Sequence, residues 1–108
     1  MHPRLRDLPR LRVLGHQVQV ADGFGARLLG LAWLDRAEAG AGLLIPRCAS
    51  VHTFGMRFPL DLVFLDRRGA PLALYRRVPP RRLVCCRGAV AVLEIPAAEG
   101  GESTGPGA

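Results

Sequence analysis

The sequence lacks lysine, has few cysteines and contains no long hydrophobic run. All 15 of its basic residues are arginine, and only three residues are cysteine. The longest apolar run, residues 28–34, is much shorter than the roughly 20 residues that cross a bilayer, which excludes a transmembrane helix. An odd number of cysteines at irregular spacing excludes a disulfide framework. The basic N-terminus precedes no apolar segment, so we expect no secretory signal and a cytoplasmic location.

The arginines give the 108-residue chain a formal net charge of +6. A high pI is the first sign of a nucleic-acid-binding protein. A phosphate-binding surface normally uses lysine as well as arginine, however. A lysine-free composition rich in alanine, glycine, arginine and proline is instead typical of GC-rich coding. We therefore expect a solvated basic surface, with an arginine-rich nucleic-acid-associated protein as an alternative.

Length and composition predict one small globular domain. With 49% hydrophobic and 22% charged residues, the chain is not disordered as a whole. About 100–150 residues is the commonest domain size. We expect a flexible arm over residues 1–11, a single domain over residues 12–98, and a disordered tail over residues 99–108, which holds almost no apolar side chains.

Alternation of polar and apolar residues predicts a β-rich fold. Short strands are expected over residues 12–20, 43–45, 60–65, 72–78, 83–86 and 89–95, and one short helix over residues 24–34. A turn at residues 66–69, with Gly69 where a positive φ is favoured, joins two of these strands. The expected fold class is α+β and mainly β: a small curled antiparallel sheet or partly closed barrel with one short helix.

The segment between residues 51 and 59 has no clean period and mixes bulky apolar residues with polar ones. Just beyond it, Asp61 interrupts an apolar strand, so its carboxylate must be paired, hydrogen-bonded or exposed at an edge. Binding residues concentrate in loops held on a rigid β scaffold. The segment therefore has two interpretations. One is a structural network that holds the loop, and the other is a binding pocket lined by His52, Thr53, Met56, Arg57 and Asp61.

The cysteines suggest two further hypotheses, a zinc site and a catalytic thiol. Cys48 and His52 have the spacing of half a zinc site, but a structural zinc needs four ligands and adjacent cysteines rarely both bind one ion. Catalysis by Cys85 or Cys86 needs a neighbouring base, which nothing in the sequence places there. We therefore expect no metal and no cofactor, and the sequence identifies no catalytic residue.

One stretch of the chain is densely basic. Its arginines are expected to form a rim for an anionic partner, such as a small ligand or a protein. They are Arg76, Arg77, Arg81, Arg82 and Arg87.

Several sequence elements follow one another in an order that resembles a known family. They are Leu28-Leu29-Gly30-Leu31, Gly42-Leu43-Leu44-Ile45, His52-Thr53-Phe54-Gly55-Met56, the run from Pro59-Leu60-Asp61 to Asp66 with Gly69, and Val92-Leu93-Glu94-Ile95. This order is similar to the bacterial and archaeal domain-of-unknown-function family 192. The resemblance spans residues 12–98.

The resemblance implies a small, mostly β, barrel-like domain with no established activity. The family's motif positions fall on Gly30, Met56, Pro59, Asp61, Gly69 and Glu94. Relatives usually continue after the Leu-Glu element with a helix and a final strand, whereas this chain continues with a polar segment. The resemblance therefore implies that the C-terminal elements of the fold are truncated, which would leave a sheet edge open or covered by another segment.

These observations favour a small non-enzymatic binding or interaction domain. The alternative is an enzyme of unknown reaction that uses His52 and Asp61 as base and acid. A cavity that joins these two side chains would favour the enzyme, whereas an Asp61 carboxylate paired with backbone would not.

Overall fold

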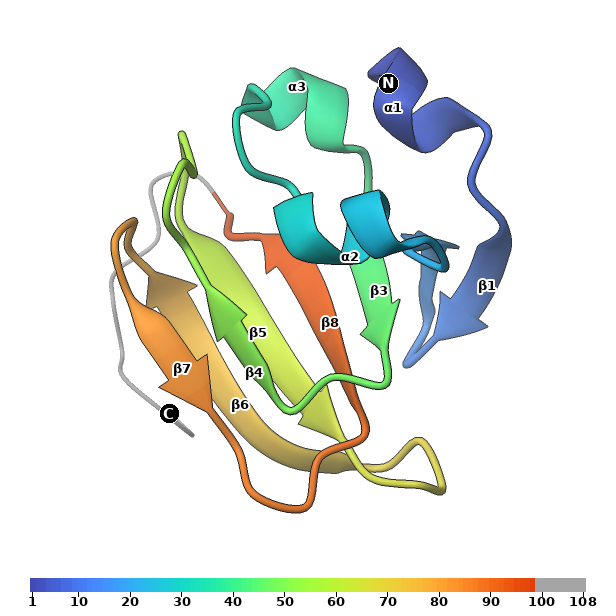
Figure 1. Cartoon of the computed structure of the whole chain (residues 1–108), viewed down its shortest axis with the longest axis vertical. Coiled ribbons are helices and arrows are strands. Elements are labelled where there is room, and N and C mark those ends of the chain that lie inside the picture. The colour runs from blue at the N-terminus through green and yellow to red at the C-terminus, as the bar shows by residue number, and fades with distance from the viewer. Residues whose placement is uncertain (99–108) are drawn as a thin grey trace.

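A computed structural model describes residues 1–98, and the tail predicted over residues 99–108 lies outside the described residues. The main sheet has six strands in the order β1-β2-β3-β8-β5-β6, and β4 and β7 form a separate two-stranded sheet. Figure 1 shows the small sheet lying over the main one. The strands are β1 (Arg10–Val13), β2 (His16–Val20), β3 (Leu43–Pro46), β4 (Ser50–His52), β5 (Leu60–Leu65), β6 (Pro71–Val78), β7 (Leu83–Cys85) and β8 (Ala91–Pro96). The predicted α+β, mainly β fold class is confirmed.

One pairing in the main sheet differs from the expected antiparallel arrangement. β2 and β3 run parallel, whereas the other neighbouring strands are antiparallel. Between these two strands the chain passes through α2 (Phe24–Leu29) and α3 (Arg36–Ala39). Such a crossover returns the chain to the end of the sheet where it started, and this permits parallel pairing. The main sheet is therefore mixed and open.

The N-terminal segment contains regular structure where a flexible arm was expected. Residues 1–11 include α1 (Pro3–Arg6) and the first residues of β1. The His2 ring accepts a hydrogen bond from the backbone N–H of Arg4, which caps this short helix. Leu5 is only 1% exposed and belongs to the main core. Burial of one leucine holds a segment whose sequence, with two prolines, suggested a loose chain.

The single strand predicted over residues 12–20 is wrong. It is a tight hairpin of β1 and β2, paired from Arg10 with Gln19 to Val13 with His16. Leu14 and Gly15 form the turn, with φ values of 51° and 83°. Two consecutive positive φ angles match the twist of a two-residue hairpin. Period-two alternation cannot reveal such a turn, because the alternation continues through it.

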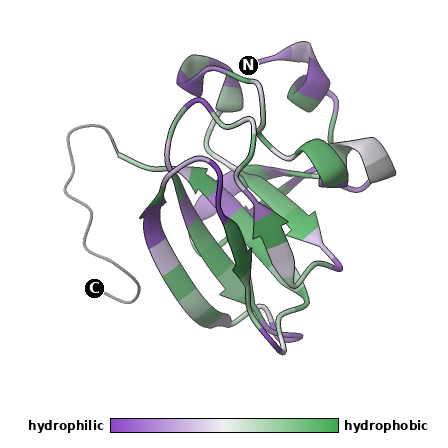
Figure 2. Cartoon of the chain, turned by 60° about the vertical axis from the view of Figure 1, so that its left-hand side comes forward, coloured by the Kyte–Doolittle hydropathy of each residue, from purple (hydrophilic) through white to green (hydrophobic). Residues whose placement is uncertain are grey.

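The two faces of the main sheet bury different sets of side chains. On β5, Leu60, Leu62 and Phe64 point to the face covered by the helices and by β4, whereas Val63 and Leu65 point to the opposite face. Figure 2 shows hydrophobic residues concentrated along the strands and hydrophilic residues in several turns. The predicted alternation of this strand is therefore confirmed.

The helices and the small sheet share one face of the main sheet. Core residues of α3 and β4, and those that follow α2, pack with the β5 side chains in one cluster, and Figure 1 shows α1 and α3 beyond one end of the sheet. α2 ends at Leu29, five residues before the predicted end at residue 34, because Gly30 has φ 54° and ψ −128°. Among residues 1–98, no helix has the length and hydrophobicity needed to cross a bilayer.

Candidate functional site

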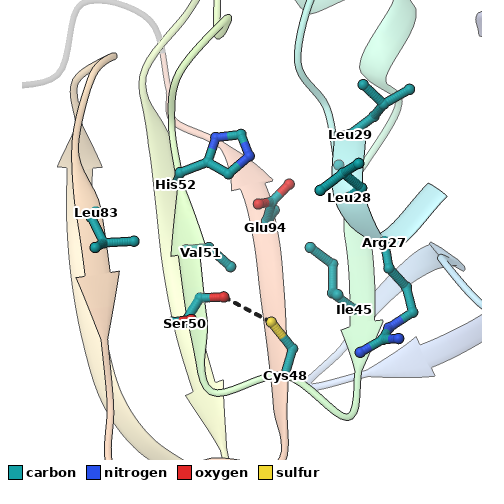
Figure 3. A pocket seen from close by; sticks show the side chains of 11 residues that line it. Arg27, Leu28, Leu29, Ile45, Cys48, Ser50, Val51, His52, Leu83 and Glu94 are labelled. Atoms are coloured by element: carbon teal, nitrogen blue, oxygen red, sulfur yellow. Dashed lines mark hydrogen bonds between the residues drawn. The ribbon is translucent and has the colours of Figure 1, made fainter. Parts of the chain in front are cut away.

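A cavity of about 170 Å³ lies between α2 and the small sheet, above the centre of the main sheet. Its walls come from α2, β3, β4, β7 and β8 and from the β3–β4 connection, so segments distant in sequence meet there (Figure 3). The lining residues are Arg27, Leu28, Leu29, Gly30, Ile45, Cys48, Ser50, Val51, His52, Leu83 and Glu94. A concave, largely apolar cavity with a few polar groups is the usual form of a small-molecule site.

Glu94 forms the floor of this cavity. It lies in β8, opposite Leu43 of β3 and Leu62 of β5, so strands flank it on both sides. Its side chain is only 3% exposed. The backbone N–H of Leu31 donates a hydrogen bond to the carboxylate. The other oxygen, Oε1, is buried and has no hydrogen-bond partner.

Gly30 allows this carboxylate to lie close to the end of α2. A Cβ atom at position 30 would lie 2.8 Å from Oε1 and 3.3 Å from Oε2 of Glu94. The backbone of Gly30 also has a φ of 54°, which non-glycine residues rarely adopt. The same glycine therefore ends the helix and makes room for the acid, and this links two positions of the sequence motif.

Burial determines the protonation of Glu94. Loss of solvent raises the pKa of its carboxyl from the ordinary 4.5 to about 7, and the hydrogen bond from Leu31 acts in the opposite direction. Arg27, the cationic residue of the cavity wall, does not neutralise it. The Arg27 guanidinium donates to the carbonyls of Pro46 and Arg47 at 3.2 and 2.8 Å. Near neutral pH the carboxyl is therefore present in both its charged and its neutral form.

His52 faces the same cavity from the end of β4. Its Nδ1 atom is buried and has no hydrogen-bond partner, and its ring lies 5.9 Å from that of Phe54, centroid to centroid. Figure 3 shows the imidazole and the Glu94 carboxyl pointing into the space between β4 and α2. In the described part of the chain, three buried side-chain polar atoms lack partners, and two of them, Glu94 Oε1 and His52 Nδ1, belong to this cavity.

Large apolar side chains surround the mouth of the cavity. Leu28 and Leu83 are 58% and 69% exposed, and Leu29 is 38% exposed. Two come from α2 and the third from β7, so they stand on opposite sides of the opening. We call these three residues the leucine rim. An acid at the bottom and apolar groups at the rim suit a ligand with one polar end and one apolar end.

Of the five residues predicted to line a pocket, Thr53 and Met56 lie elsewhere in the structure. Thr53 is fully buried, and its hydroxyl donates to the carbonyl of Pro79 at 2.7 Å and accepts from the N–H of Arg82 at 2.8 Å. Met56 is 7% exposed and packs in the main core. Neither lines the cavity that holds His52. Their contacts agree with the structural interpretation of this segment.

Arg57 and Asp61 also lie outside that cavity. Arg57 forms an exposed ion pair with Asp35, with 3.0 Å between Nη1 and Oδ1. The Asp61 carboxylate accepts a 2.9 Å hydrogen bond from the backbone N–H of Arg77, across the β5–β6 pair. The structure thus does not assemble the His52–Asp61 pair on which the enzyme hypothesis rested. Glu94 is the acid that shares the cavity with His52.

The predicted arginine rim is spread along the β6–β7 region. Arg76, Arg81, Arg82 and Arg87 are exposed, whereas Arg77 is half-buried and donates to the carbonyl of Ala98. Arg81 and Arg82 precede β7 and Arg87 follows it, so the strand separates them. An anionic partner on this surface stays a prediction.

The cysteines show no metal-binding arrangement in the part of the chain that the structure describes. No group of three or more histidine, cysteine or acidic side chains there could hold an ion, and all three cysteines are free thiols. Cys48 lines the cavity, and its thiol donates to the carbonyl of Ser50. The C-x3-H spacing of Cys48 and His52 therefore places two residues on the wall of one cavity.

Reasoning from residue types missed Glu94 as a pocket residue. The resemblance placed it among the motif positions, but with no role. The available signal was a carboxylate inside the apolar run Val92–Ile95, the same signal that drew attention to Asp61. Sequence alone cannot tell which of two such acids pairs with backbone and which faces a cavity.

Comparison with known proteins agrees with this fold. A comparison with curated proteins gives no match. A protein from Sinorhizobium meliloti 1021, described as a "putative transcription regulator", has a TM-score of 0.67 and 21% identity, covering 82% of this chain and 78% of that one. A protein of unknown function from Novosphingobium aromaticivorans DSM 12444 has a TM-score of 0.61 and 17% identity, covering 91% and 88%. At these identities the likeness shows the fold alone.

The sequence also matches a family model. The model is that of DUF192, described as an uncharacterized ACR, and it matches residues 10–102. The match includes the Gly30 and Glu94 positions that form the cavity floor. Because it extends over most of the chain, the chain belongs to the DUF192 family.

Proposed function

We propose that this protein is a small-molecule-binding domain whose ligand enters the cavity under α2 and hydrogen-bonds to Glu94. The observation that carries the proposal is the buried Oε1 atom of Glu94, which has no hydrogen-bond partner in the described part of the chain, residues 1–98. Buried polar groups in folded proteins are nearly always hydrogen-bonded. A buried polar atom without a hydrogen bond costs the folded state about 1–3 kcal/mol. A ligand that hydrogen-bonds to Oε1 would recover this free energy.

The position of Glu94 supports a binding role over a purely structural one. Asp61 and Glu94 each accept one backbone hydrogen bond, from Arg77 and Leu31, but Oε1 of Glu94 is buried without a partner among residues 1–98. A purely structural acid would be expected to lie where both of its oxygens can pair or reach solvent. Glu94 instead lies in the middle of a six-stranded sheet, where an apolar residue would pack without cost. His52 adds a second unpartnered polar atom to the same cavity. Two such atoms give a ligand fixed points for orientation.

The proposal retains the binding domain expected from the sequence and replaces its site. The cavity of His52 and Glu94 takes the place of the His52–Asp61 loop. The expected ligand also differs. The arginines suggested a small anion, but a carboxylate at the floor of the cavity would repel one. No reaction is assigned to the site.

A fragment titration followed by NMR tests the proposal. Small aromatic compounds that carry amine, amide, hydroxyl or carboxylate groups are added to the ¹⁵N-labelled protein. At least one chemical class is expected to shift the amide signals of Gly30, His52 and Glu94 in a saturable way. Ser50→Phe, which fills the cavity from an exposed position on β4, is expected to abolish these shifts.

The matched control is Asp7→Asn, which removes an exposed acid that does not line the cavity and is expected to bind like the unmodified protein. The proposal fails if no fragment shifts the cavity residues. It also fails if Ser50→Phe binds as well as the unmodified protein.

A further inference from the structure

We propose that the cavity selects a small organic cation, an amidinium or primary ammonium on an apolar body, and pairs its charge with the carboxylate of Glu94. This inference rests on the proposed ligand-binding function and names the chemical class of the ligand. It follows from the groups around Glu94, from the unpartnered carboxylate oxygen and from the leucine rim.

Within residues 1–98, no cationic side chain pairs with Glu94, although the chain contains 15 arginines. Arg27, on α2, uses its guanidinium on the carbonyls of Pro46 and Arg47. Arg4, on α1, reaches toward the end of α2 but donates to the carbonyls of Gly30 and Ala32 at 3.0 and 2.8 Å. Both of the nearby guanidinium groups thus bind backbone oxygens. Among residues 1–98, no ion pair involves Glu94.

The other titratable groups that face Glu94 do not neutralise it either. His52 lies on β4, and its Nδ1 is unpartnered. Cys48, on the β3–β4 connection, donates its thiol hydrogen to a backbone carbonyl. Loss of solvent is consequently the main influence on the Glu94 carboxyl, and it favours the neutral form. A cation that enters the cavity would replace the lost solvent and restore the charge.

The carboxylate geometry suits a donor with more than one N–H. One carboxylate oxygen accepts from the N–H of Leu31, and the other, Oε1, is buried beside the cavity and has no partner among residues 1–98. Charge-assisted hydrogen bonds of this kind are shorter and stronger than neutral ones. An amidinium carries several N–H groups, so it could donate to Oε1 and still offer a donor to the unpartnered Nδ1 of His52 in the same cavity.

The size of the cavity and its apolar rim determine the size and polarity of the uncharged part of the ligand. An apolar cavity of about 150 Å³ holds one benzene molecule, and this cavity measures about 170 Å³. The leucine rim (Leu28, Leu29 and Leu83) continues it with exposed apolar surface on two sides. A single ring or a short branched chain would fit with its charged end at Glu94 and its apolar end between the leucines.

Three probes that share one ring separate the classes of ligand. Benzamidine is a cation, benzamide is neutral and benzoate is an anion, and each is titrated into the protein by NMR and calorimetry. At about pH 8, where most of the Glu94 carboxyl is charged, benzamidine is expected to bind at least about tenfold more tightly than benzamide. Benzoate is expected not to bind at the cavity.

The pH dependence gives a second readout. Benzamidine stays protonated throughout the range tested, so only the charge of the protein changes. With a pKa of about 7, roughly one Glu94 carboxyl in thirty is charged at about pH 5.5. The affinity for benzamidine is therefore expected to fall roughly thirtyfold from about pH 8 to about pH 5.5. If the protonated carboxyl bound a neutral ligand instead, the affinity for that ligand would rise as the pH falls.

Two variants assign the effect to its residue. Glu94→Gln keeps the size of the side chain and is expected to abolish both the preference for benzamidine and the pH dependence. His52→Gln is expected to weaken binding but to keep the pH dependence. If the dependence disappears in His52→Gln and persists in Glu94→Gln, the inference is overturned.

The inference and the proposed function fail in different ways. If benzamide or benzoate shifts the cavity residues as strongly as benzamidine, the cavity binds ligands but does not select cations. If none of the three probes binds at millimolar concentration while other fragments do, the cation assignment is overturned and the binding function stands. If no compound shifts the cavity residues at all, both are refuted.

Discussion

Replacing Glu94 by glutamine should remove a large pH-dependent contribution to the stability of this domain. In the folded protein, burial raises the pKa of Glu94 from 4.5 to about 7. The folded state therefore holds a proton more tightly than the unfolded chain does. By linkage, the free energy of unfolding falls as the pH rises between these two values. The contribution is fully present below about pH 4.5 and is lost once the pH passes about 7.

The size of this loss follows from the difference between the two pKa values. At 1.36 kcal/mol for each pH unit, the difference between 4.5 and about 7 corresponds to about 3 kcal/mol. The side chain is only 3% exposed, so solvent screening removes little of this amount. A domain of this size is stable by about 5–15 kcal/mol, which makes the effect a substantial fraction of the total.

Urea unfolding followed by circular dichroism measures the effect. The free energies of unfolding of the unmodified protein, Glu94→Gln and Asp7→Asn are compared at about pH 5 and about pH 8. From the lower to the higher pH, the unmodified protein should lose roughly 2–3 kcal/mol relative to Glu94→Gln, because glutamine does not titrate. Asp7→Asn should follow the unmodified protein. Histidine contributions are common to all three proteins and cancel in the comparison.

One result would refute the reasoning directly. If the difference in unfolding free energy between the unmodified protein and Glu94→Gln is the same at both pH values, Glu94 titrates normally in the fold. Its carboxyl would then be solvated or paired in solution. The cavity would lose the feature on which the proposed function rests.

Further substitutions separate the cavity from its surroundings. Gly30→Ala should destabilise the fold by about 1–3 kcal/mol and abolish benzamidine binding. The new Cβ would lie 2.8 Å from Oε1 of Glu94, and the backbone φ of 54° disfavours alanine. Urea unfolding measures the loss of stability, and NMR titration measures the loss of binding. Thr53→Val should cost about 1–3 kcal/mol, since it removes two part-buried hydrogen bonds to the β6–β7 connection, one to the carbonyl of Pro79 and one from the N–H of Arg82. Its pH dependence of stability should be unchanged. Asp61→Asn should cost about 1 kcal/mol by weakening the bond to the N–H of Arg77, and it should leave benzamidine affinity unaltered. A large loss of affinity in Asp61→Asn would place that residue back in the site.

Local patterns predicted much of the β structure, because alternation of apolar and polar residues and the preferences of turn residues act over a few positions. Leu60–Leu65 alternates between two buried faces and was predicted with correct bounds. The following turn was also predicted, and in it the Asp66 carboxylate accepts from the N–H groups of Arg68 and Ala70. Gly69 has the expected positive φ of 79°. In these segments, residues a few positions apart determine the conformation.

The errors arose where distant contacts decide the outcome. The arm at residues 1–11 is ordered because Leu5 reaches the core of a sheet whose strands come much later in the chain. The hairpin at Leu14-Gly15 was hidden by an alternation that continues through the turn. Pairing of β2 with β3 in parallel depends on a crossover whose path the local sequence does not specify.

The sequence by itself determined the family, the fold class and the polar residues that needed explanation. It identified His52, and it placed Gly30 and Glu94 among the motif positions. Only the tertiary structure decided that Asp61 binds the backbone across the β5–β6 pair, whereas Glu94 has one buried oxygen, Oε1, that lacks a partner among residues 1–98 in the cavity it shares with His52. The physical reason is that two acids inside apolar strands look alike in sequence. Their surroundings differ only after strands and a helix from distant parts of the chain have packed around them.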